Sequence, residues 1–149
     1  MKKILLVFLV LYIDLHSLEK KSTIKIYTEI FSNLSSKEFI CLYTNDKEYI
    51  KIFKESKNIK LTSKVKNANI ALITDYRTLK YVLKQSNSSD NRPPILFATE
   101  YKLLKKSSDI VGALYWRKGR SQLLFIKKRL SKHGINLPNE YQNYIIESL

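Results

Sequence analysis

The sequence predicts a single α/β domain: a mostly parallel central sheet flanked by helices, with a C-terminal antiparallel hairpin. Short apolar segments alternate with amphipathic ones through most of the chain, which is typical of parallel strands joined by right-handed helical crossovers. The last two apolar segments instead flank a short turn that contains a glycine, as a hairpin does. The 149 residues fit one domain and leave no room for a second.

The first residues have the plan of a secretory signal peptide. Lys2 and Lys3 precede ten apolar residues, from Ile4 to Ile13. A helix of that length is about 15 Å long, half of a hydrocarbon core of ~30 Å, so we expect cleavage rather than retention as an anchor. We therefore predict a signal peptide over residues 1–17 and a folded domain over 18–149. The alternative is a buried first strand or helix.

Two helices and two strands are expected next. Residues 24–34 place apolar side chains near one helical face. Residues 39–44 are a compact apolar strand, and residues 49–56 follow with helical spacing. Residues 58–63 alternate apolar and polar side chains, which predicts a partly exposed strand at the edge of the sheet.

The middle of the chain repeats this alternation. Residues 69–74 are the most apolar strand candidate, and residues 79–84 follow as a helix that ends before a polar surface loop over residues 85–91. Two prolines then lead into a strand over residues 95–99 and a short helix over residues 100–105.

The last quarter leaves the alternation. Residues 111–116 and 121–126 flank a four-residue connection over 117–120 and predict a hairpin. Residues 127–133 then fit a two-turn helix that is ended by a glycine. Pro138 opens a final predicted helix that carries the apolar residues up to position 146.

The chain is strongly basic, with 27 Lys and Arg against 13 Asp and Glu. Without the leader it keeps 25 basic and 12 acidic residues, a net charge of +13. Such a charge ordinarily suggests nucleic acid, but export argues against that partner. Two interpretations stay open: a solvated lysine coat, or a surface for anionic lipid head groups or acidic proteins.

Acidic residues follow three of the predicted strands. Asp46, Asp75 and Glu100 come directly after apolar segments, and the carboxyl ends of parallel strands line the usual ligand crevice. One interpretation is a small-solute or cation-binding site built from the three side chains. The other is helix capping, because carboxylates accept hydrogen bonds from the free N–H groups at helix starts and suit the helix dipole.

The hairpin turn carries the residues that we predict to contact a partner: Trp116, Arg117, Lys118 and Arg120. Trp and Arg are enriched at binding hot spots, because Trp offers a large rigid surface and Arg offers planar stacking and forked donors. The alternative is that Trp116 faces inward and closes one end of the core, with the cationic tip simply solvated.

Catalytic, cofactor and metal sites are not indicated. No nucleophile elbow and no nucleophile beside a base is legible. His16 lies in the leader, and His133 has no second ligand residue at suitable spacing, so a surface role near a helix end is expected. Cys41 is the only cysteine, lies between Ile40 and Leu42, and is predicted to pack in the core.

The order of landmarks resembles the YfiR family of periplasmic regulators over about residues 24–148. The first strand Ile40-Cys41-Leu42-Tyr43 ends in Asn45-Asp46, and Ala68 to Ile73 and Pro94 to Phe97 stand where that family has its next strands. In the tail, the places of family landmarks are held by Gly112, Gly119-Arg120, Phe125-Ile126 and the basic segment Lys127 to Ile135.

The resemblance implies a non-enzymatic periplasmic module. Members of the family restrain a membrane-bound diguanylate cyclase through its outward-facing sensor domain and thereby lower cyclic di-GMP in the cell. The expected partner is therefore an inner-membrane sensor, a diguanylate cyclase or a histidine kinase, and a homodimer stays open. Two departures stand out: Cys41 has no second cysteine for an internal disulfide, and the hairpin turn is basic where the family's is commonly acidic.

Overall fold

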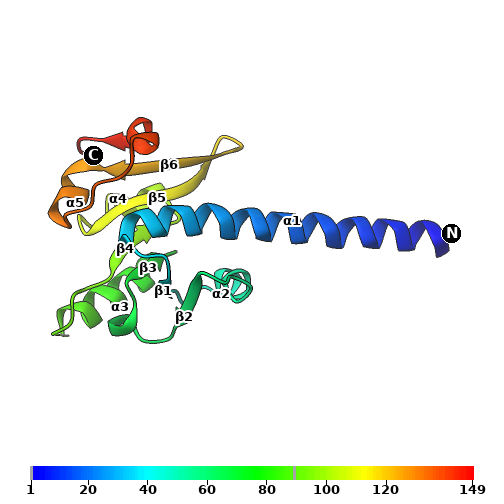
Figure 1. Ribbon diagram of the computed structural model, residues 1–149, viewed down its shortest axis with the longest axis horizontal. Coiled ribbons are helices and arrows are strands. Elements are labelled where there is room, and N and C mark those ends of the chain that lie inside the picture. Colours follow the sequence, from blue (N-terminus) through cyan, green and yellow to red (C-terminus); the bar gives the residue numbers. More distant parts are fainter. Residues whose placement is uncertain (1, 89) are drawn as a thin grey trace.

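Seven strands form one mixed sheet in the computed structural model, which describes residues 2–88 and 90–149, with side chains from residue 19 onward. The strands lie in the order β2-β1-β3-β4-β5-β6-β7 (Figure 1). Pairing is parallel except between β5 and β6, which are antiparallel. The strands are β1 (Ile40–Tyr43), β2 (Ile59–Thr62), β3 (Ile70–Ile73), β4 (Ile95–Ala98), β5 (Ile110–Arg117), β6 (Arg120–Ile126) and β7 (Ile145–Ile146). The predicted α/β fold with a C-terminal hairpin is confirmed, and β2 lies at the edge as expected.

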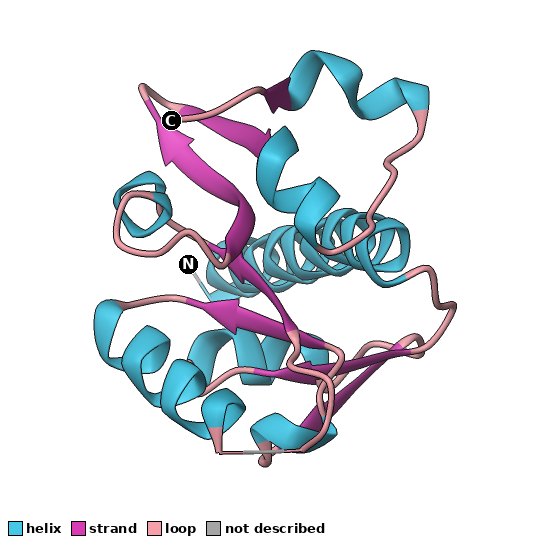
Figure 2. Ribbon diagram, turned by 90° about the vertical axis from the view of Figure 1, so that its left-hand side faces the viewer, coloured by secondary structure: helices cyan, strands magenta, loops and turns pink. Residues whose placement is uncertain are grey.

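Helices cover both faces of the sheet (Figure 2). They are α1 (Lys2–Ser35), α2 (Lys47–Phe53), α3 (Tyr76–Asn87), α4 (Tyr101–Leu104) and α5 (Lys127–Lys132), with 3-10 helices η1 (Val65–Asn67) and η2 (Asn139–Tyr144). Helices α1 and α2 pack on one face, and α3 and α4 pack on the other.

The alternation of side chains along each strand assigns them to these two faces. In β3, Ile70 and Leu72 join the cluster under α1 and α2, whereas Ala71 and Ile73 join the cluster under α3 and α4. The first cluster is rich in aromatic rings: Tyr27 meets Phe53 edge to face at 5.5 Å between centroids. Both faces of the strand are buried, as parallel sheets require.

Helix α1 is longer than the sequence predicts. It runs without a break from Lys2 to Ser35 and projects past the sheet toward the end at which the β5-β6 hairpin reaches out (Figure 1). The structure does not describe the side chains of the predicted leader, residues 1–17. Among the described side chains of α1, those that pack in the core begin at Ile24. In the described part of the chain, no helix is both long and apolar enough to cross a membrane.

The predicted bounds are wrong for α3 and for the last predicted helix. Helix α3 continues to Asn87 instead of ending at residue 84, since Ser86 and Ser88 bond back to carbonyls of the preceding turn and so fit a helical end. Residue 89 of the predicted loop lies outside the described residues. The predicted last helix is only the 3-10 turn of η2, because Ile145 and Ile146 extend and pair with β6 as β7.

Candidate functional site

The β5-β6 hairpin closes in a two-residue turn. The predicted four-residue connection is wrong, because the ladder continues to the pair of Arg117 and Arg120. Lys118 and Gly119 both have positive φ, +50° and +76°, which is the backbone of a type I′ turn and matches the right-handed twist of the two strands. The tight turn therefore places four predicted contact residues at the very end of the hairpin.

The tip of the hairpin is open to solvent. The side chain of Trp116 is 73% exposed, so the interpretation that it faces inward and closes the core is wrong. Arg117, Lys118 and Arg120 are also exposed. Within the described part of the chain, none of the three has a carboxylate in ion-pair distance. The tip therefore carries three positive charges within four residues, with no carboxylate of the described residues beside them.

A groove lies at the foot of this tip. It has a volume of about 590 Å³ and is lined by Thr99, Glu100, Tyr101, Lys102, Tyr115, Trp116 and Arg117. The rings of Tyr101 and Tyr115 lie 5.5 Å apart. Lys102 donates to Glu100 at 2.8 Å, and this contact raises the pKa of Lys102. The structure thus brings Glu100 to the same groove as Trp116 and Arg117.

The other two strand-end carboxylates cap helices. Asp46 accepts hydrogen bonds from the backbone N–H groups of Glu48 (2.9 Å) and Tyr49 (3.2 Å) at the start of α2. Asp75 accepts from the backbone N–H of Thr78 (2.7 Å) at the start of α3. That bond is the main reason why the pKa of Asp75 lies below its usual value. Capping, the second of the two interpretations, is confirmed for Asp46 and Asp75.

The strand ends between β1 and β3 are joined by a buried hydroxyl. Thr78 is fully buried. Its Oγ1 donates a hydrogen bond to Asn45 Oδ1 at 2.7 Å and also lies 3.1 Å from Asp75 Oδ1. Among the described residues, no group of three His, Cys, Asp or Glu side chains is placed to hold a metal ion. The carboxyl groups of Asp46 and Asp75 are engaged by the backbone, and Glu100 by Lys102. The crevice interpretation therefore gains no support from this arrangement.

Sequence reasoning missed a group of polar residues at the opposite edge of the sheet. Cys41 is not fully buried as predicted: it is a free, half-buried thiol that faces a cavity at the amino ends of the strands. Lys37, Arg92 and His133 line the same cavity. Attention to the residues that precede the predicted strands, as well as those that follow them, would have singled out Lys37 and Arg92.

Comparison with known proteins identifies no relative: no family model, no curated protein and no solved structure matches the chain.

Proposed function

We propose that this chain is an exported, non-enzymatic regulatory protein whose hairpin tip docks on a membrane-bound sensor of the diguanylate cyclase type and so modulates cyclic di-GMP signalling. It acts in the periplasm. The observation that carries the proposal is the exposed Trp116 on a tip whose three cations have no ion-pair partner among the described residues. The order of landmarks that resembles the YfiR family supports the choice of partner.

The tip has the composition of a binding hot spot. A tryptophan that is mostly exposed in the free protein offers a large rigid apolar surface for burial by a partner. Arg117 and Arg120 lie directly opposite each other in the ladder, and like charges in that position destabilise a hairpin. An acidic surface on the partner would remove this repulsion. The groove at the foot of the tip extends the contact area with the rings of Tyr101 and Tyr115.

Export is compatible with the packing of α1. The described side chains of α1 join the core from Ile24 onward. Its most deeply buried members are Tyr27, Ile30, Phe31 and Leu34. Loss of residues 1–17 would therefore remove none of these contacts. A mature chain that begins near residue 18 would keep these core contacts of α1.

Complementation in the cell tests the function. Deletion of the gene should change intracellular cyclic di-GMP, and the wild-type gene should restore it. We expect Trp116→Ala and Arg117→Glu to fail to restore it although the proteins accumulate normally in the periplasm. Lys47→Glu, a charge reversal at an exposed position on α2, is the matched control and should restore it. Unchanged cyclic di-GMP on deletion would contradict the proposal.

Localisation is tested independently by the intact mass of the protein. The periplasmic fraction should contain a chain that lacks the first 17 residues or a closely similar number. A cytosolic chain that still carries Met1 and the whole leader would exclude a periplasmic regulator.

A further inference from the structure

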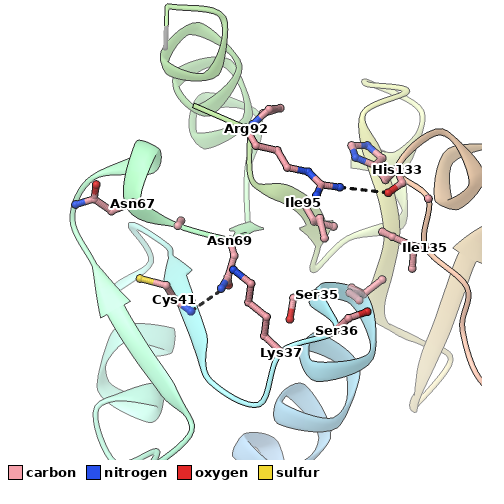
Figure 3. Close-up of a pocket in the computed structure, with 14 residues that line it drawn as sticks. Ser35, Ser36, Lys37, Cys41, Asn67, Asn69, Arg92, Ile95, His133 and Ile135 are labelled. Atoms are coloured by element: carbon pink, nitrogen blue, oxygen red, sulfur yellow. Dashed lines mark hydrogen bonds between the residues drawn. The ribbon is translucent and has the colours of Figure 1, made fainter. Parts of the chain in front are cut away.

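A second candidate site lies at the amino edge of the sheet, away from the hairpin tip. A cavity of about 510 Å³ opens where β1, β3 and β4 begin, and its walls include the end of α1 and the residues that follow α5 (Figure 3). Cavities of this size accommodate small organic ligands. Nothing in the proposed function uses this cavity.

Basic side chains line the cavity. Lys37, Arg92 and His133 line it, and its described lining residues include no Asp or Glu. They come from three separate parts of the chain: the segment after α1, the segment before β4, and the end of α5. The fold therefore brings these three side chains together around one cavity. Lysines that are spread evenly over the surface would not form such a cluster.

Polar groups without charge complete the lining. Asn69 Oδ1 accepts the backbone N–H of Cys41 at 3.0 Å, which fixes the amide and leaves its NH₂ group as a donor. Ser36, directly after α1, and Asn67, in η1, also line the cavity, on different sides of it (Figure 3). The cavity thus offers several neutral donors beside its cations.

Two details concern the basic side chains of the cavity. The guanidinium of Arg92 donates to the backbone carbonyl of His133 at 3.4 Å, so one side of its fork is directed across the mouth of the cavity (Figure 3). The Nε2 atom of His133 is buried and has no hydrogen-bond partner among the described residues. A buried nitrogen without a partner is costly.

We propose that this cavity binds a small phosphate-bearing anion. An arginine fork presents paired donors that match phosphate oxygens, and a lysine adds a flexible point charge. Lys37 and Arg92 are exposed in the free protein, so water and salt compete with an anion for them, and the binding should weaken at high ionic strength. A carboxylate ligand is the competing occupant, and comparison of the two ions distinguishes them.

Thermal unfolding of the full chain, with inorganic phosphate as the probe, gives the first test. Phosphate should raise the midpoint more than chloride or acetate at equal ionic strength, and this extra rise should be smaller in Arg92→Gln. Exclusion of phosphate from protein surfaces stabilises every variant alike, whereas specific binding to the folded state does not. Arg92→Gln and Lys37→Gln should each weaken phosphate binding, by about tenfold for Arg92. Lys47→Gln removes one charge at the opposite edge of the sheet and should leave it unchanged.

The thiol of Cys41 gives an independent readout. It is the only cysteine of the chain and lines the cavity, so alkylation by a neutral maleimide reports on this site alone. Phosphate should slow the alkylation in the wild type and in Lys47→Gln, but much less in Arg92→Gln. Arg92 is exposed, so its replacement should not unfold the chain. Arg92→Lys, which keeps the charge and loses the fork, should bind with intermediate strength.

Three results would overturn the proposal: equal stabilisation by phosphate and chloride, a loss of phosphate binding in Lys47→Gln as large as in Arg92→Gln, or a stronger effect of acetate than of phosphate. The first would mean that the cavity has no anion site. The second would assign the effect to the net charge of the protein, and the third would favour a carboxylate ligand. None of these results bears on docking at the hairpin tip.

Discussion

The hairpin tip and the strand-end carboxylates both lie at the carboxyl edge of the sheet and both consist of polar side chains. They differ in whether these side chains already have partners within the protein. Asp46 and Asp75 are engaged by backbone N–H groups of the helices that they start. Arg117, Lys118 and Arg120 have no ion-pair partner in the described part of the chain. Polar residues that already satisfy the backbone stabilise the fold, whereas unsatisfied ones beside an exposed Trp116 are available to a partner.

The largest effect should come from the base of the hairpin, which contrasts with its tip. A Cβ atom at Gly112 would lie 2.6 Å from the carbonyl oxygen of Leu124 and 2.6 Å from Cδ1 of Phe125. We expect Gly112→Ala to lower the free energy of unfolding by about 1–3 kcal/mol, measured by urea denaturation. At the tip, Gly119→Asn meets no neighbour and keeps a residue that tolerates positive φ, so its effect should stay within about 0.5 kcal/mol. Similar losses at both positions would contradict the contrast.

Removal of a cap should have the next largest effect. Asp75→Ala should lower the free energy of unfolding by about 1 kcal/mol, because the N–H of Thr78 loses its acceptor. Asp75→Asn keeps an acceptor at the helix start and should be nearly as stable as the wild type. A stable Asp75→Ala variant would mean that the carboxylate is not a structural cap.

The same cap predicts a dependence on pH. The N–H of Thr78 lowers the pKa of Asp75 below its ordinary value of 3.8. The stabilisation by the charged carboxylate is therefore complete above about pH 4 and is lost as the pH falls through the lower pKa of the folded state. The free energy of unfolding of the wild type should therefore fall in acid relative to that of Asp75→Asn, and parallel curves would count against this assignment.

At the amino edge of the sheet, His133 should also make stability depend on pH, because the folded protein resists its protonation. Burial, with a smaller contribution from the charge of Lys132, lowers the pKa of His133 below 6.5. The folded state then binds fewer protons than the unfolded chain, so the free energy of unfolding should fall as the pH drops through 6.5. His133→Asn should flatten this part of the curve, and an unchanged slope would contradict the assignment.

The smallest effect is a gain in stability at the tip. Arg120→Thr relieves the repulsion from Arg117 across the ladder and should raise the free energy of unfolding by about 0.2–1 kcal/mol. The gain should shrink at high salt, because exposed charges are screened. A loss of stability would show that Arg120 makes a contact that the fold needs.

The fold was predictable from the sequence where a local pattern decides it. The apolar runs gave β1, β3 and β4, and the glycine between two β-rich segments gave the hairpin. The last predicted helix failed because its cause is not local: Ile145 and Ile146 form a strand only through pairing with β6. The helical spacing of apolar residues in this segment does not show that the edge of β6 is free to pair with it.

The candidate sites divide in the same way. Trp116 and its cations could be identified because the turn is encoded by adjacent residues, although its exposure could not be known. The cavity with Lys37, Arg92 and His133 could not be identified, because its members are separated by tens of residues and meet only at one end of the sheet. Glu100 joined the hairpin groove rather than the other carboxylates for the same reason.

The most direct test compares Trp116→Ala with Asp75→Ala in two measurements: the thermal midpoint, and capture by the purified periplasmic domain of the membrane diguanylate cyclase of the same organism. Trp116→Ala should lose capture and keep its midpoint, whereas Asp75→Ala should unfold earlier and still be captured below its midpoint. If Trp116→Ala is captured like the wild type but unfolds at a much lower temperature, the tryptophan is part of the core and the tip is not the docking surface.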